Sequence, residues 1–318
     1  MISVDAIESA RERIADTAVR TPLVRLHVDA PAEIWLKLEN LQPIASFKIR
    51  GAANAVRAAD PAELDGGLVT ASAGNMAQGV AWIARELGLP ATIVVPEHAP
   101  EAKTAAVERL GGKVMRVPYA DWWRAIEGSR VEGLEGLFVH PVEDEHVMAG
   151  NGTIGLEILE DLPEPEAVVV PYGGGGLVTG IASALRALRP GTRVYAVEPE
   201  TGAALNAALA AGEPTKIDYR PSFVDGSGSP QVLPGMFARV RELIDGAFTA
   251  TLDETAAAVR LLAERTRVVA EGAGGLAPAA ALAGHAGEGR VVCVVSGGNI
   301  DLSTLAPILA GETPHPPR

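Results

Sequence analysis

The sequence predicts an α/β protein whose sheets are mostly parallel and are flanked by helices. Short runs of β-branched residues alternate along the 318-residue chain with longer stretches rich in alanine and leucine. The runs are continuously apolar, which is typical of parallel strands covered by helices on both faces. We expect strands at residues 33–39, 67–72, 91–96, 113–117, 137–140, 167–171, 193–199 and 290–296. Ligands bind beyond the carboxyl ends of such strands, so the residues after each run are the candidate site.

Composition restricts the classes of partner. The chain has 27 lysines and arginines against 40 aspartates and glutamates, a formal net charge of −13, which is a poor match for nucleic acid or an anionic membrane. The apolar runs are far shorter than the roughly 20 residues of a membrane-spanning helix. Residues 1–22 read as an amphipathic helix and not as a signal peptide. Cys293 is the sole cysteine, which suits a reducing compartment, so we expect a cytoplasmic protein. Since nucleic acid and membrane are disfavoured, we expect its partner to be a small molecule.

A lysine near the start of a predicted helix is the first candidate catalytic residue. The segment SFKIRGAAN, residues 46–54, predicts a helix capped by Ser46, with Lys48 in its first turn. The helix dipole, burial and the neighbouring Arg50 would all disfavour a positive charge there. A lysine kept partly neutral can act as a nucleophilic amine. The alternative is that the Lys48 side chain simply extends to solvent.

Four consecutive glycines follow the apolar run at 167–171. The segment Gly173, Gly174, Gly175 and Gly176 lies between a predicted strand and a predicted helix. Its backbone can turn sharply and point N–H groups at an anion, and the following helix adds its positive end. We interpret the segment as a phosphate-binding loop, with a flexible turn as the alternative.

The glycine segment departs from both common nucleotide-binding motifs. The pattern G-x-x-x-x-G-K-[ST] is absent. The dinucleotide pattern G-x-G-x-x-G fails because its last glycine falls on Val178 or Thr179. Glu198 nevertheless stands about where a ribose-binding acid would be expected. A nicotinamide-dependent oxidoreductase is therefore the alternative from a different reaction class.

An activated lysine and a phosphate-binding loop together indicate pyridoxal 5'-phosphate, a carbonyl cofactor that carries a phosphate. Ser296, which ends the run at 290–296, can offer a neutral hydroxyl to the pyridine nitrogen. A neutral partner makes the ring a weaker electron acceptor, which favours eliminations that expel a leaving group promptly. The alternative is that Ser296 only begins an ordinary turn.

The segment SAGNMAQG, residues 72–79, joins a predicted strand to a predicted helix. Ser72, Asn75 and Gln78 can bind a substrate carboxylate together with the N–H groups that begin the helix. Asn75 can also reach the hydroxyl of the cofactor ring. Helix capping by Ser72 and Asn75 is the alternative, and it is compatible with binding.

The order of these motifs resembles the fold-type II pyridoxal-phosphate enzymes, in particular the threonine/serine dehydratase branch that contains threonine deaminase and serine racemase. The resemblance covers nearly the whole chain, and seven motifs in sequence make it specific. They are RTPLVRL (20–26), KLENLQPIASFKIRGA (37–52), TASAGNMAQG (70–79), HPVEDEHVMAGNGTIGLEI (140–158), PYGGGGLVTGI (171–181), EGAGG (271–275) and SGGNIDL (296–302).

The resemblance implies a tryptophan synthase β-like fold with two open, twisted, mostly parallel sheets. It implies a large cofactor-binding domain from residues 1–51 and 144–318, and a small mobile domain, residues 52–143, that closes over substrate. It also implies a homodimer.

The same resemblance implies a role for individual residues. Lys48 would form the internal aldimine, with Glu271 and Asp225 bordering the site. The implied cofactor contacts are Phe47, Lys48, Asn75, Gly173, Gly174, Gly175, Gly176, Leu177, Glu271, Ser296 and Gly297. The implied substrate contacts are Ser72, Ala73, Gly74, Asn75 and Met76.

A few positions depart from the family pattern. Serine racemase carries a serine at the position of Ala73, where it moves a proton on the cofactor face opposite the lysine, so racemisation is disfavoured here. Met76 stands where the family usually has histidine. A divalent-cation site of the family pairs an acid at Glu198 with another at the position of Ala204, and we expect no metal.

We therefore expect a dehydratase, or ammonia-lyase, that converts a β-hydroxy amino acid such as L-threonine or L-serine into a 2-oxo acid and ammonia. Lys48 would remove the α-proton as general base, and the resemblance implies that the cofactor phosphate protonates the leaving hydroxyl. The alternatives are a hydroxyaspartate or β-aryl serine as substrate, a racemase or β-replacement enzyme on the same cofactor, and a non-catalytic amino-acid-binding relative.

Overall fold

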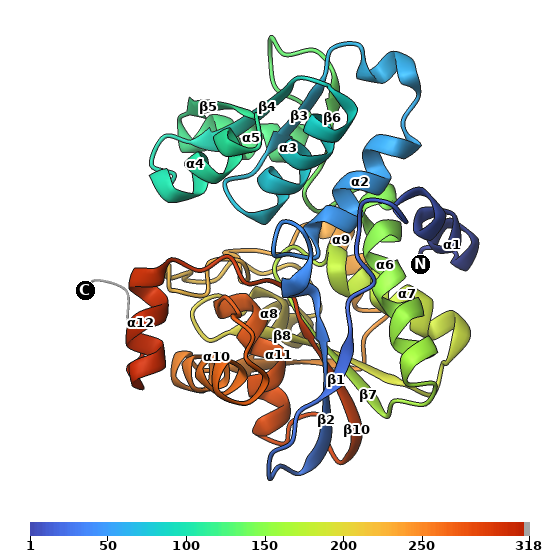
Figure 1. Ribbon diagram of the computed structural model, residues 1–318, viewed down its shortest axis with the longest axis vertical. Helices are drawn as coiled ribbons and strands as arrows, with labels where there is room; N and C mark the ends of the chain where they lie inside the picture. The colour runs from blue at the N-terminus through green and yellow to red at the C-terminus, as the bar shows by residue number, and fades with distance from the viewer. Residues whose placement is uncertain (315–318) are drawn as a thin grey trace.

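The computed structural model describes residues 1–314, apart from the side chain at position 102. Two sheets organise this part of the chain, as Figure 1 shows. The six-stranded sheet has the order β1 (Leu23–Arg25), β2 (Ala32–Leu38), β10 (Gly289–Val295), β7 (Ala167–Pro171), β8 (Arg193–Pro199) and β9 (Gly246–Ala250). The four-stranded sheet has the order β5 (Lys113–Val117), β4 (Ala91–Pro96), β3 (Leu68–Ala71) and β6 (Leu137–Phe138).

Helices surround both sheets. The α-helices are α1 (Val4–Arg13), α2 (Lys48–Ala58), α3 (Asn75–Leu87), α4 (Glu101–Arg109), α5 (Tyr119–Gly128), α6 (Glu145–Asp161), α7 (Gly176–Leu188), α8 (Ala204–Ala211), α9 (Pro234–Val240), α10 (Leu252–Thr266), α11 (Gly272–Leu282) and α12 (Leu302–Ala310). Two short 3₁₀ helices, η1 (Glu39–Leu41) and η2 (Pro61–Leu64), follow β2 and α2. Within residues 1–314, no helix combines the length and the apolar composition that crossing a membrane requires.

The pairing of the strands confirms the predicted α/β class. β1 runs antiparallel to β2, and the other pairings within the two sheets are parallel. Parallel strands need helical crossovers, which explains why helices alternate with strands along the chain.

Most strands lie at or within one residue of the bounds that the apolar runs predict. β4, β5, β7 and β8 have the predicted bounds, and β2, β3 and β10 differ by one residue at each end. β6 is shorter than predicted, and the edge strands β1 and β9 were not predicted. The N-terminal helix is also shorter than predicted, because it ends at Arg13 and Thr17 then turns inward to donate to Glu86 at 3.0 Å.

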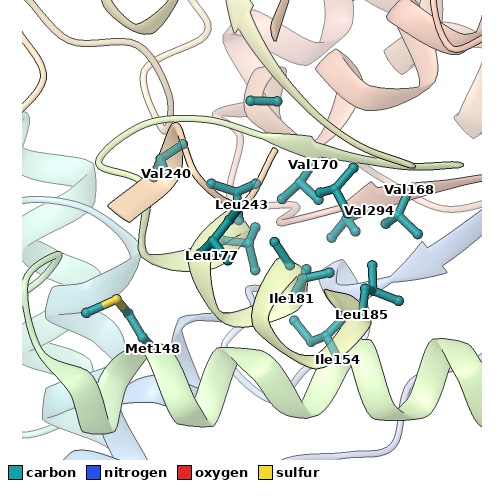
Figure 2. Close-up of a cluster of buried hydrophobic side chains, with 14 of the residues drawn as sticks. Met148, Ile154, Val168, Val170, Leu177, Ile181, Leu185, Val240, Leu243 and Val294 are labelled. Atoms are coloured by element: carbon teal, nitrogen blue, oxygen red, sulfur yellow. The ribbon is translucent and has the colours of Figure 1, made fainter. Parts of the chain in front are cut away.

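Alternate residues of the central strands pack on opposite faces of the six-stranded sheet. One face packs against α1, α6, α7, α8 and α9, and Figure 2 shows part of this cluster. It includes Val168, Val170 and Val294 from the strands with Leu177, Ile181 and Leu185 from α7. The other face packs against α10 and α11, and Cys293 lies there as the predicted core residue.

The four-stranded sheet has its own core. α2, α3 and α4 contribute apolar side chains on one face, and α5 covers the other. In Figure 1 this sheet and α3–α5 form the upper lobe, the six-stranded sheet lies below, and α2 and α6 lie between the two. The first residue of α2 is Lys48, so the candidate lysine lies where the two lobes meet.

Candidate active site

Lys48 lies in the first turn of α2 as predicted, but Ser46 is not its cap. Phe47 occupies the N-cap position, and no side chain caps the helix. Ser46 is buried and forms a β-bridge with Gly297. Its backbone is therefore committed to the neighbouring segment, although its Oγ still accepts a hydrogen bond from the Lys48 N–H at 3.4 Å.

This bridge holds the end of β10 beside the start of α2. The Phe47 N–H donates to the Ser296 carbonyl at 3.1 Å, and the Gly298 N–H donates to the Ala45 carbonyl at 2.8 Å. Residues that are about 250 positions apart in the sequence are thus fixed by backbone bonds. The arrangement brings Ser296 and Lys48 to the same cavity.

The Lys48 amine lies against protein atoms in that cavity. It donates to the Pro141 carbonyl at 3.1 Å and lies 5.3 Å from the centre of the Phe47 ring. Burial lowers the pKa of Lys48 to about 8. An amine with this pKa has an accessible neutral form near pH 7, which nucleophilic and general-base chemistry requires.

The prediction that Arg50 disfavours the positive charge on Lys48 is wrong. Its guanidinium is buried and pairs with Glu39 at 2.8 Å and with Glu157 at 2.6 Å. Lys37 pairs with the same Glu157 at 2.5 Å. Two cations and two anions thus form a buried network, and Arg50 points into it because these carboxylates offset its charge. The lowered pKa of Lys48 comes from burial alone.

The glycine loop connects β7 to α7. Gly175 has φ 99°, a left-handed conformation that favours glycine, and it occupies the N-cap position of α7. A Cβ added at Gly174 would collide with the Val142 side chain. Within residues 1–314, the N–H groups of Gly173, Gly174 and Gly175 donate to no protein acceptor. The loop therefore combines unused N–H donors with the positive end of a helix.

One cavity joins these groups. It is lined by Phe47, Lys48, Pro141, Pro171, Gly173, Gly174, Gly175, Gly176, Leu177, Gly226, Ser227 and Ser296. Ser296 is buried and presents its neutral hydroxyl side chain at this cavity. An amine, unused N–H donors and a neutral hydroxyl match the aldehyde, phosphate and pyridine nitrogen of pyridoxal phosphate, so the donor set fits this cofactor.

Asn75 and Glu271 meet beside the cavity. Asn75 Nδ2 donates to Glu271 Oε1 at 2.9 Å, and its Oδ1 accepts from Asn299 Nδ2 at 2.8 Å. A Cβ added at Gly297 would collide with the Glu271 carboxyl group. Burial, with a smaller effect from Asp225, raises the pKa of Glu271 to about 8. The carboxyl group is therefore mostly protonated at pH 7.

The predicted substrate-binding segment leads into α3. Gly74 occupies the N-cap position, and neither Ser72 nor Asn75 caps the helix through its side chain. Ser72 Oγ accepts from the Gly74 N–H at 3.3 Å, and Ala73 is partly buried against the core of the four-stranded sheet. The Met76 side chain is buried in that core, so only its backbone can face a ligand. The first N–H groups of α3 remain as candidate donors to a carboxylate.

The Glu198 carboxylate binds backbone N–H groups at the start of α8. It accepts hydrogen bonds from the N–H groups of Leu205 and Asn206, each at 2.9 Å, and so caps α8. Burial raises the pKa of Glu198 to about 7. Ala204 adds no second carboxylate. Among the described residues, no group of three or more His, Cys, Asp or Glu side chains gathers as a metal site would require.

The sequence indicated the segment 223–237 as part of the pocket wall, but it assigned no role to several residues that line or support the cavity. The Pro141 carbonyl accepts a hydrogen bond from the Lys48 amine, and the neighbouring His140 ring makes three hydrogen bonds to backbone groups. Gly226 and Ser227 also line the cavity. The glycines of the segment DGSG, residues 225–228, were the available signal for the last two. A backbone carbonyl has no residue type of its own, so no sequence signal marks Pro141.

The comparison with protein families agrees with this site. The model of the family described as pyridoxal-phosphate dependent enzymes matches residues 14–297. The chain belongs to this family, and its cofactor is pyridoxal 5'-phosphate.

Individual relatives narrow the resemblance to one branch. The chain is 40% identical over 315 residues to an L-threonine ammonia-lyase of Thermotoga maritima, covering 97% of this chain and 78% of that protein. It is 36% identical to serine racemase of Rattus norvegicus, covering 99% and 98%. Its fold matches threonine deaminase isoform 2 of Solanum lycopersicum with a TM-score of 0.87 and 33% identity, covering 97% and 89%. The predicted fold-type II class is confirmed.

Proposed function

We propose that the protein is an ammonia-lyase that converts a β-hydroxy amino acid, such as L-threonine or L-serine, into a 2-oxo acid and ammonia. The observation that carries the proposal is the shared cavity, in which the Lys48 amine lies with the unused donors of the glycine loop and the Ser296 hydroxyl. Relatives named L-threonine ammonia-lyase, at 37–40% identity, support the same reaction.

The roles of the cavity residues follow from their chemistry. Pyridoxal phosphate, when bound, supplies an aldehyde that accepts an amine and a ring that takes up electrons from Cα. The glycine loop and the first turn of α7 would hold its phosphate, and the Ser296 hydroxyl would be the partner of its pyridine nitrogen. Lys48 would supply the amine that holds the aldehyde, and the neutral form of the same amine would act as the base for the Cα proton of the substrate. A serine hydroxyl, unlike a carboxylate, would not hold a proton on that nitrogen, and this partner suits a reaction in which the β-hydroxyl leaves promptly.

The segment 72–76 is the proposed site for the substrate carboxylate. The free N–H groups at the start of α3 and the open space around Gly74 support this position. Asn75 is held by Glu271 and Asn299 on either side, so its amide is oriented before any ligand binds.

Racemisation is the second candidate, because serine racemase is among the relatives. Ala73 opposes it. An alanine side chain cannot deliver a proton to the face of Cα opposite Lys48, whereas elimination needs only one base.

Purified protein saturated with pyridoxal phosphate tests the proposal. L-threonine, L-serine, 3-hydroxyaspartate and 3-phenylserine are supplied separately, and 2-oxo acid, ammonia and the D-enantiomer of each substrate are measured. We expect 2-oxo acid and ammonia in equal amounts from at least one substrate. Accumulation of the D-enantiomer without 2-oxo acid, or no turnover of any of the four, would refute elimination.

We also propose a homodimer that works in the cytoplasm. Three exposed aliphatic side chains, Val19, Leu41 and Val269, lie on adjoining segments, because Gln42 Nε2 donates to the Val19 carbonyl at 2.7 Å and Asn40 Nδ2 to the Val269 carbonyl at 2.9 Å. Such a patch favours burial against a second copy. Light scattering of the wild type and of Leu41→Arg tests the dimer, since a monomeric wild type would contradict it.

The cytoplasmic location is a separate proposal. It is supported by the single buried cysteine, and fractionation of the native cells would test it.

A further inference from the structure

The imidazole of His140 bonds to three backbone groups. Nδ1 lies 3.0 Å from the Val142 N and 2.7 Å from the Glu143 N, and Nε2 lies 3.0 Å from the Ile126 carbonyl oxygen. The residue is buried. Because two N–H groups point at Nδ1, that atom must be the acceptor, and the ring proton must be on Nε2. Only the neutral Nε2–H tautomer satisfies all three bonds.

The turn that His140 holds touches both halves of the cavity. The Pro141 carbonyl accepts from the Lys48 amine at 3.1 Å. Val142 packs against the glycine loop, where a Cβ added at Gly174 would collide with its side chain and one at Gly176 would lie 3.3 Å from its carbonyl oxygen. A change in this turn would therefore move the partner of the lysine and the wall of the glycine loop together.

We propose that His140, neutral and protonated on Nε2, is a positioning residue that sets the turn at residues 141–143 against both Lys48 and the glycine loop. Ile126 belongs to α5, so the ring also ties the upper lobe of Figure 1 to the lysine. The inference rests on the proposed function only in treating Lys48 and the glycine loop as the cofactor site.

The surroundings of His140 favour its neutral form. Burial lowers the pKa of His140 and outweighs the opposite effects of the Ile126 carbonyl, Glu143 and Asp144, while the nearby Lys48 lowers the pKa slightly further. The Phe138 ring, 6.2 Å away, is the aromatic neighbour. A proton on Nδ1 would point at two N–H groups and break the turn.

Two variants separate the functions of the two ring nitrogens. In His140→Asn, Oδ1 stands where Nδ1 was and can still accept from the turn, while the bond to Ile126 is lost. In His140→Gln, the side-chain amide reaches the Ile126 carbonyl, while the acceptor for the turn is lost. His98→Gln, at a side chain that is 90% exposed, is the matched control.

Three measurements do not depend on turnover. Imidazole ¹⁵N shifts of the wild-type protein report the tautomer. Titration with pyridoxal phosphate gives its dissociation constant, and the pH dependence of Lys48 labelling by fluorodinitrobenzene, read by peptide mass spectrometry, gives the state of the amine. We expect His140→Gln to bind the cofactor on the order of 10-fold or more weakly with altered Lys48 labelling, and His140→Asn to stay within about 3-fold of the wild type.

Each outcome decides the inference. A proton on Nδ1 in the wild type, or equal cofactor affinity and Lys48 labelling in His140→Gln and the control, would overturn it. If neither variant folds, the tautomer of His140 in the wild-type protein alone tests the inference. If His140→Gln loses cofactor affinity while the wild type catalyses no elimination, the proposed function is refuted and this inference is still supported.

Discussion

Lys48 and Glu271 both lie among protein atoms that disfavour their charged forms. Burial lowers the pKa of the lysine to about 8 and raises the pKa of the glutamate to about 8. At pH 7 the lysine therefore has a reachable neutral form, and the glutamate carries a proton. The two groups need no mutual contact to reach these states, because each responds to its own surroundings.

Glu271→Gln tests the state of the glutamate. A carboxyl group whose folded-state pKa is raised from 4.5 to about 8 contributes stability that is complete below 4.5 and is lost as the pH rises towards 8. Glutamine does not titrate and can still accept the hydrogen bond from Asn75. We expect the melting temperature of the cofactor-free variant to vary less between pH 5 and pH 8 than that of the wild type.

Calorimetry across this range makes the measurement, with the exposed Glu132→Gln as control. Parallel curves for Glu271→Gln and the wild type would show that Glu271 is ionised in the folded protein.

At the scale of elements, the network of Lys37, Glu39, Arg50 and Glu157 ties β2, η1, α2 and α6 together. Arg50 is two residues from Lys48 on α2, so the network fixes the helix that carries the lysine. The network holds equal numbers of cations and anions, and removing one member leaves an uncompensated charge in the interior.

Arg50→Met should therefore destabilise the fold strongly. We expect a loss of about 3–5 kcal/mol in the free energy of unfolding, because Glu39 and Glu157 lose their shared partner. Arg124→Met, which removes an exposed pair with Asp121, should cost at most about 1 kcal/mol. Urea unfolding measures both, and equal losses would show that the buried network contributes nothing beyond a surface pair.

The glycine loop makes a second prediction at this scale. Gly174→Ala places a methyl group against Val142 and should displace the loop, so we expect cofactor affinity to fall on the order of 10-fold. Gly191→Ala is the control, since no atom lies within 4 Å of an added Cβ there. Titration with pyridoxal phosphate measures both. Unchanged affinity in Gly174→Ala would mean that the phosphate binds elsewhere.

Elements and contacts differ in how far the sequence predicts them. The bounds of β4, β7 and β8 were predictable because these central strands are largely buried and mostly apolar. β5 is a half-exposed edge strand, and Val114, Met115 and Val117 marked it. β1 and β9 were not predicted, since β1 has only three residues and β9, GAFTA, is mostly half-exposed and has no β-branched apolar residue. Lys48 and the glycine loop were found through their residue types, whereas the role of Ser46 and the direction of Arg50 depend on pairing with distant segments.

At the scale of the whole molecule, the division into residues 1–51 with 144–318 and a smaller unit of residues 52–143 remains our proposal. The four-stranded sheet and its separate core support it. Lys103 on α4 pairs at 2.5 Å with Asp225, which lies between α8 and α9, so an ion pair joins the two lobes in the pocket that Glu271 also lines. We propose that the smaller unit closes over substrate.

Hydrogen exchange tests this closure. With pyridoxal phosphate bound, L-alanine, which lacks a leaving group, should slow exchange in α3 and α4 and leave α12 unchanged. Lys103→Ala should reduce that protection because it removes the pair that joins the two lobes. Protection equal in α12 and α4, or none in either, would argue against a mobile unit.

The most direct test of the account compares the wild type with Lys48→Ala, both incubated with pyridoxal phosphate and checked for folding by circular dichroism. We predict a yellow wild type that releases 2-oxo acid from a β-hydroxy amino acid. The variant should lack the same absorbance band and lose turnover on the order of 1000-fold or more. A colourless wild type, or full turnover without the Lys48 amine, would contradict the central claim.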